Sequence, residues 1–137
     1  MSGGHRRVDL AVLATVSLGG VLGSLGRYTV GAALPSTPGG FPWATLVVNV
    51  SGAFAMGLLV AYLVDRPGTH RLARPFLGVG VLGGWTTFSS YAVEGRDLFA
   101  SGSPWLGLGY VLGSLVVGLF AVGVGVTAGE RLFGRRR

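Results

Sequence analysis

The sequence contains no cysteine and no lysine, and only 12% of its residues are charged. Without cysteine the chain has no disulfide, no thiolate metal site and no cysteine nucleophile. A soluble domain usually carries about a quarter charged residues, so this charge content argues against a soluble protein. Half of the residues are apolar, and the mean hydropathy of +0.61 points the same way.

Groups that carry enzyme chemistry are also scarce. The two histidines, His5 and His70, lie in polar flanks, and no carboxylate lies deep within an apolar stretch. The sequence shows no metal-ligand cluster and no phosphate-binding loop with its lysine. We therefore expect that the chain is not an enzyme.

Four long apolar stretches are present, and each has room for about one membrane crossing of roughly 20 residues. They cover about residues 9–33, 43–64, 73–99 and 104–128, and glycine, proline or polar segments separate them. The first stretch lacks the small-residue cleavage site of a good signal peptide. The sequence predicts an all-α integral membrane protein with one domain, residues 1–137, and four transmembrane helices.

All eleven basic residues are arginine, and the net charge is +6. Most lie between or beyond the apolar stretches, where they act as topology signals, so we expect no nucleic-acid partner. Four spans place both termini and the second connection on one side, which carries nine of the eleven arginines. The opposite side has Arg96 alone. We expect a plasma-membrane protein whose N- and C-termini are cytoplasmic.

Glycines recur four residues apart, a spacing that lets two helix backbones approach closely. The pairs are Gly19 and Gly23, Gly80 and Gly84, Gly109 and Gly113, and Gly125 and Gly129. The pattern predicts tight helix packing and says nothing about function.

The third apolar stretch is unusual over residues 83–91, which read GGWTTFSSY. Two glycines, four serine or threonine hydroxyls and three aromatic rings meet there at mid-membrane depth. Either the helix breaks and frees carbonyls that could bind a cation, or it continues and the hydroxyls bond to their own backbone. Composition leaves both alternatives open.

Two further polar residues stand out. Asn49 lies in the middle of the apolar second stretch, where it either makes an interhelical hydrogen bond or donates its NH₂ group to an anion. Arg27 lies near the end of the first stretch. It either extends to the lipid headgroups or draws anions to an aqueous entrance.

Three segments resemble the CrcB/Fluc fluoride channels, and the resemblance covers nearly the whole chain. The segments are GGVLGSLGRY at 19–28, TLVVNVSGAF at 45–54, and GGWTTFSSY at 83–91 followed by Glu94. The resemblance implies a channel that exports cytoplasmic fluoride passively and lowers its toxicity. It also implies a break in the third helix and an antiparallel, dual-topology dimer with two pores at the subunit interface.

The resemblance assigns roles to single residues. Asn49 is expected to donate its amide hydrogens to fluoride, and the ring edges of Phe88 and Tyr91 are expected to face the ion. The family usually has phenylalanine at both aromatic positions, so the hydroxyl of Tyr91 either donates to the ion or restricts the passage. The other expected pore-lining residues are Thr87, Ser89, Tyr110 and Ser114, the last two on one helical face.

The resemblance also implies groups outside the narrow pore. Arg27 is expected in the vestibule, and Glu94 near a pore end. A structural sodium ion, which is not transported, is expected at the dimer centre. Its ligands are expected to be the backbone carbonyls of Gly83 and Thr86 from both subunits, because main-chain oxygen suits a hard cation.

The arginine asymmetry bears on the partner subunit. A chain with one strong orientation signal favours a heterodimer with a related, oppositely oriented subunit, although the family also contains homodimers. A small four-span multidrug or cation exporter is an alternative function, but it needs a carboxylate within the membrane. A non-transporting membrane assembly subunit is another, but it does not require Asn49 or the 83–91 segment.

Overall fold

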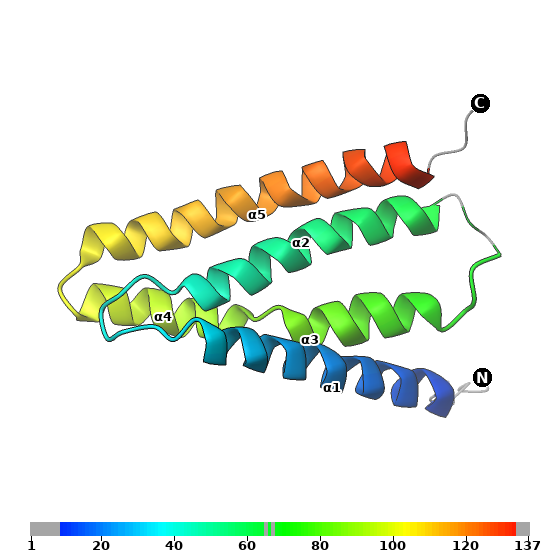
Figure 1. Cartoon of the computed structure of the whole chain (residues 1–137), viewed down its shortest axis with the longest axis horizontal. Helices are drawn as coiled ribbons and strands as arrows, with labels where there is room; N and C mark the ends of the chain where they lie inside the picture. Colours follow the sequence, from blue (N-terminus) through cyan, green and yellow to red (C-terminus); the bar gives the residue numbers. More distant parts are fainter. Residues whose placement is uncertain (1–8, 65, 67, 134–137) are drawn as a thin grey trace, which may run out of the picture.

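The computed structural model describes residues 9–64, 66 and 68–133, and every regular element in that part of the chain is a helix (Figure 1). In chain order these are α1 (Leu10–Ala33), α2 (Trp43–Val64), the π-helix η1 (Pro75–Leu82), α3 (Gly83–Trp85), α4 (Phe88–Ala100) and α5 (Pro104–Phe133). Helices α1, α2 and α5 are long and apolar enough to cross a membrane, which supports an integral membrane protein.

The helices follow the expected apolar stretches closely, with one difference. Helix α5 continues to Phe133, beyond the expected end near residue 128. The third stretch is divided into η1, α3 and α4, as expected from the break that the family resemblance implies. His5, Asp65 and several arginines counted in the sequence lie outside the described residues, namely Arg6, Arg7, Arg135, Arg136 and Arg137.

Local signals set several helix ends. At the start of α1, the carboxylate of Asp9 accepts the backbone N–H groups of Ala11 and Val12, at 3.0 and 3.4 Å. This N-cap satisfies donors that have no partner within the helix. Gly39 and Gly102 have φ angles of 74° and 81° in the two loops at one end of the molecule, a conformation that glycine adopts without strain.

The helices form two packed pairs (Figure 1). Helix α1 lies along η1 and α3, and α2 lies along α5, while α4 returns to contact α5. Both termini of the described chain and the α2–η1 connection lie at one end, with Arg66, Arg71, Arg74 and Arg131. We call this the arginine end. The α1–α2 and α4–α5 loops lie at the opposite end.

Three of the four expected glycine pairs pack within the protomer. A Cβ added to Gly19 would lie 2.6 Å from the Phe76 carbonyl oxygen, and one added to Gly129 would lie 2.5 Å from the Cβ of Ala61. Such contacts show that the backbones touch there. Added Cβ atoms at Gly109 and Gly113 would meet nothing within 4 Å. That pair therefore packs against no described residue of its own protomer.

The surface is strongly apolar. Large side chains are more than half exposed along α1 and α5, including Leu18, Leu25, Trp105, Val116 and Phe120. An apolar surface of this extent marks contact with a membrane or with another subunit.

Candidate functional site

The third segment breaks at Thr86 and Thr87, both of which have extended backbone angles. In an unbroken helix the Thr87 N–H would donate to the carbonyl of Gly83. It donates instead to Oδ1 of Asn49 at 2.8 Å, and Nδ2 of Asn49 donates to the Thr87 carbonyl at 2.9 Å. One side chain of α2 therefore satisfies both backbone groups of Thr87.

This geometry distinguishes between a broken and a continuous third helix. It also bears on whether Asn49 makes an interhelical hydrogen bond or donates to an anion. The break is present, so the continuous helix is excluded. Asn49 makes an interhelical bond, but Nδ2 carries two hydrogens and Thr87 uses one of them. The second hydrogen is left for another acceptor.

Three more contacts hold the break. The Thr87 hydroxyl caps α4 by accepting the Ser90 N–H at 3.2 Å, and it lies 3.3 Å from the hydroxyl of Ser89. Arg27 donates from its guanidinium to the Thr86 carbonyl at 2.9 Å. Because the break exposes backbone at mid-segment, these donors and acceptors replace the missing helical bonds.

A groove with a volume of about 510 Å³ opens beside the break, and we call it the central groove. The expected site residues that line it are Asn49, Gly83, Thr86, Thr87, Phe88, Tyr91 and Ser114. The rest of its lining is Gly52, Ala53, Met56, Gly78, Leu82, Leu115 and Val122. None of these described lining residues is charged, and the Phe88 side chain is 79% exposed.

Ser114 lines this groove and has an unusual hydroxyl group. Its hydroxyl oxygen is buried and has no hydrogen-bond partner among the described residues. Buried polar atoms are nearly always paired in proteins. No described residue therefore uses the hydrogen-bonding capacity of this hydroxyl.

Tyr91 uses its hydroxyl within the protomer. The hydroxyl donates to the Val111 carbonyl of α5 at 2.9 Å, which occupies its one proton. The ring lies 5.8 Å from that of Phe88 and 5.5 Å from that of Tyr110, centre to centre. A row of aromatic rings thus leads from the break toward the opposite end.

Glu94 ends this row. It accepts hydrogen bonds from Thr45 at 2.9 Å and from Tyr110 at 3.0 Å. Tyr110 is only 1% exposed and does not line the central groove, although it is four residues from Ser114. Glu94 also borders a pocket of about 220 Å³ beside the α1–α2 loop.

Three polar residues of the site were given no role in the sequence analysis. Thr45 bonds to Glu94, and the Trp85 indole N–H donates to the hydroxyl of Ser51 at 2.9 Å. Thr45 precedes Asn49 by four residues, so the two lie on one face of α2. That spacing was a usable signal, but the partner on α4 could not be read from it.

A sequence profile described as "CrcB-like protein, Camphor Resistance (CrcB)" matches residues 14–126, which is most of the chain. The chain belongs to the CrcB family. All three resembling segments and the whole central groove lie within the matched residues.

Three curated relatives are similar to this chain over 82% to 94% of their own length. A protein of Nocardia farcinica named "Fluoride-specific ion channel FluC 2" is 47% identical over 95% of this chain and 93% of its own. One of Paracoccus denitrificans, "Fluoride-specific ion channel FluC", is 49% identical over 86% and 94%. One of Streptomyces coelicolor, "Fluoride-specific ion channel FluC 1", is 42% identical over 92% and 82%.

Proposed function

We propose that this chain is a subunit of a fluoride-specific ion channel, through which cytoplasmic fluoride leaves passively and its toxicity is lowered. The family and the names of the curated relatives support this function. The observation that carries it is the central groove, where neutral hydrogen-bond donors gather beside a broken helix with no charge among the described lining residues.

The chemistry of the groove suits fluoride, which is small and tightly hydrated. The second N–H of Asn49 and the hydroxyl of Ser114 replace lost water. The ring edges of Phe88 and Tyr91 add partial positive charge. Because no full charge traps the ion, it binds strongly enough to enter and weakly enough to leave. A membrane potential supplies about 2.3 kcal/mol per 100 mV for the outward step.

The remaining residues act around this path. Arg27 lies next to the break and provides positive potential for an approaching anion. The Ser89 hydroxyl extends the row of donors. Thr87 lines the central groove, but its hydroxyl donates to the Ser90 hydroxyl at 3.1 Å. Tyr110 and Glu94 occupy the side of the path toward the opposite end.

A second subunit completes the pore in this proposal. The central groove is open on one side, and Phe88 projects away from its own protomer. In an antiparallel dimer the partner closes the groove. Helices η1, α3 and α4 have 8, 3 and 13 residues, so none alone spans about 30 Å of hydrocarbon, and together they form the fourth span.

Orientation follows from the arginine end, which we place in the cytoplasm with both termini. This bias favours a heterodimer with an oppositely oriented relative over a homodimer. The numbered names FluC 1 and FluC 2 are compatible with genomes that carry more than one such chain. Single cysteines introduced near Arg71 and Arg96, labelled from each side of the membrane, test this: equal labelling from both sides contradicts the fixed orientation.

A structural sodium ion at the dimer centre is part of the proposal. Diversion of the Thr87 N–H to Asn49 leaves the carbonyl of Gly83 without the donor that a continuous helix would give it. The Thr86 carbonyl already accepts from Arg27, but a carbonyl oxygen has a second lone pair. The two carbonyls would hold the ion and the ion would join the two breaks. Replacing sodium with N-methylglucamine should lower the melting temperature of the purified dimer.

Efflux from liposomes tests the function. Liposomes with the purified protein should release fluoride and retain chloride. Asn49→Asp should abolish the release, because it puts a carboxylate in the groove and removes the donor to the Thr87 carbonyl. Met56→Leu, an apolar exchange in the same groove, should conduct like the native chain. Chloride release by the native protein, or unchanged fluoride release by Asn49→Asp, would contradict the proposal.

A further inference from the structure

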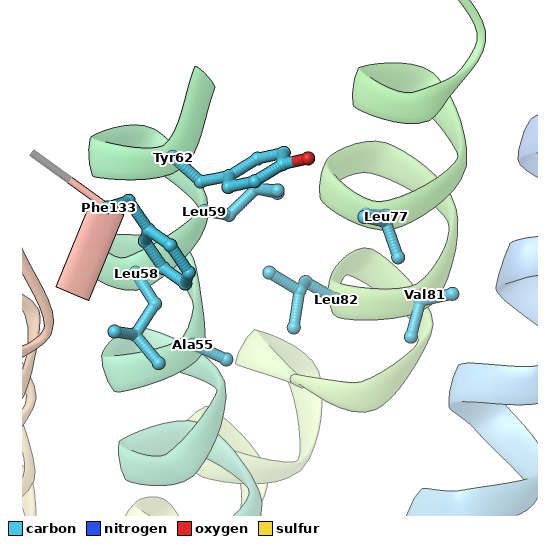
Figure 2. A pocket seen from close by; sticks show the side chains of 8 residues that line it. All are labelled: Ala55, Leu58, Leu59, Tyr62, Leu77, Val81, Leu82 and Phe133. Carbon is cyan, nitrogen blue, oxygen red and sulfur yellow. The ribbon is translucent and has the colours of Figure 1, made fainter. Parts of the chain in front are cut away.

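A second groove lies between α2 and η1 and extends toward the arginine end (Figure 2). We call it the α2–η1 groove. Its volume is about 280 Å³, and it is lined by Ala55, Leu58, Leu59, Tyr62, Leu77, Val81, Leu82 and Phe133. The Tyr62 hydroxyl is the one polar side-chain group among these described residues. The groove borders the central groove only at Leu82.

The groove forms because α2 and η1 each pack mainly against another helix. Helix α1 packs along η1 and α2 packs along α5, whereas α2 and η1 make few contacts at this end. From Ala55 to Tyr62 the groove runs about 10 Å along α2 at 1.5 Å per residue. It therefore connects the middle of the helices with their arginine end.

The mouth of the groove is polar. The guanidinium carbon of Arg66 lies 4.4 Å from the ring centre of Tyr62 and 5.9 Å from that of Phe133. Figure 2 shows the Tyr62 ring reaching from α2 across the gap, with its hydroxyl toward η1. The Arg66 guanidinium and the Tyr62 hydroxyl thus lie at one end of the apolar α2–η1 groove.

We propose that the α2–η1 groove binds an anionic phospholipid, with an acyl chain between the helices and the phosphate at Arg66 and the Tyr62 hydroxyl. Water does not fill the body of the groove, because a buried water needs two to four polar partners. A guanidinium matches a phosphate in charge and geometry. Anionic lipids also concentrate on the cytoplasmic leaflet, the side to which an arginine-rich end is directed.

Arg71 offers a matched control for the headgroup. It lies at the same end, but its guanidinium is already paired with Asp9 at 2.8 Å. We expect the purified channel to bind phosphatidylglycerol more tightly than phosphatidylcholine with the same acyl chains. Arg66→Gln should reduce this preference about fivefold, the effect of one basic residue at an anionic surface. Arg71→Gln should leave it unchanged. Native mass spectrometry of the intact assembly measures both.

The body of the groove has its own test. Leu77→Trp fills the space, so lipids with either headgroup should be lost from the assembly. Leu22→Trp places the same ring on an exposed position of α1, outside the groove, and should retain them. Fluoride efflux by both variants checks that they fold. Equal lipid retention in native, Arg66→Gln and Leu77→Trp protein would overturn the proposal.

A crosslinker separates a lipid from a second copy of the chain. Because the sequence has no cysteine, Leu77→Cys introduces a single thiol, which can carry a benzophenone maleimide. Irradiation in phosphatidylglycerol liposomes should give an adduct with the mass of one lipid. A covalent pair of chains would show that a protomer covers the groove and would overturn the proposal.

Discussion

The broken segment η1–α3–α4 and helix α5 make an instructive comparison. Helix α5 contains seven glycines in thirty residues and runs without interruption, whereas the other segment breaks at Thr86 and Thr87. Glycine content alone therefore does not break a helix in this protein. The two segments differ in what packs against the backbone. Asn49 bonds to Thr87 in the broken segment, whereas Gly125 and Gly129 of α5 pack against Gly57 and Ala61.

The two regions are stabilised in different ways. Helices α2 and α5 approach at their glycines and form a closely packed pair. The broken segment leaves its regular hydrogen bonding only because polar groups of α1 and α2 bond to the freed backbone. The central groove consequently lies where the two regions meet.

The largest expected effect comes from Asn49→Ala. The substitution leaves the N–H and carbonyl of Thr87 without partners, at about 1–3 kcal/mol for each buried group. We expect a large fall in unfolding temperature and loss of fluoride efflux. Ser114→Ala on α5 is the control for stability alone, because the Ser114 hydroxyl has no partner among the described residues whose loss would destabilise the fold. Equal stability of the two variants would remove the distinction between the regions.

Glycine substitutions should come next. A Cβ at Gly80 would lie 2.9 Å from the Cα of Gly19, so Gly80→Ala should cost about 1–3 kcal/mol through overpacking. Gly113 faces open space, and Gly113→Ala should be neutral or stabilise α5 by up to about 1 kcal/mol. Unfolding of both variants in detergent measures this. A marked loss for Gly113→Ala would mean that another subunit covers this face.

Substitution of two threonines, one in each region, should have smaller effects on stability. Thr87→Val removes the cap of α4 and should cost about 1 kcal/mol. Thr127→Val on α5 removes only a hydroxyl that bonds to the Gly123 carbonyl of its own helix, so we expect little change. Thermal unfolding of both variants measures this difference. Similar losses of stability would show that the Thr87 cap contributes no more than a hydroxyl within a helix.

Tyr91→Phe tests the link between the two regions. It removes the hydrogen bond to the Val111 carbonyl, worth about 1 kcal/mol, and keeps the ring. Fluoride efflux should continue, with a modestly lower unfolding temperature. Loss of efflux in a folded Tyr91→Phe channel would place the hydroxyl on the ion path instead.

The smallest effect is expected at Asp9, outside both regions. Hydrogen bonding from the Val12 N–H, with help from Ala11 and Arg71, holds the Asp9 pKa below its ordinary value of 3.8. A carboxyl group with a lowered pKa stabilises the fold above the ordinary value and loses this contribution as pH falls through the lowered pKa. Asp9→Asn should therefore lower stability slightly at pH 7 and match the native chain in strong acid. A pH series of unfolding temperatures checks this.

Particular residues show how far sequence reasoning reached into the site. The composition of residues 83–91 singled out the segment where the helix breaks but left a continuous helix open, and the family resemblance predicted the break. Asn49 stood out in its apolar stretch. The partner of Asn49 was not predictable, because an amide can bond to any group that the opposite helix presents. The bond from Tyr91 to Val111 was hidden for the same reason, since the acceptor is a main-chain carbonyl that every residue has.

Hydropathy and helix-breaking residues located the apolar helices to within about five residues, because these signals depend on each stretch alone. The spacing of the apolar stretches also showed that arginines collect at one end. Which glycines touch, which groups hold the break and where the two grooves open became visible only in the folded chain. Those outcomes depend on the rotation of each helix about its axis and on its neighbour, and these are properties of pairs of helices.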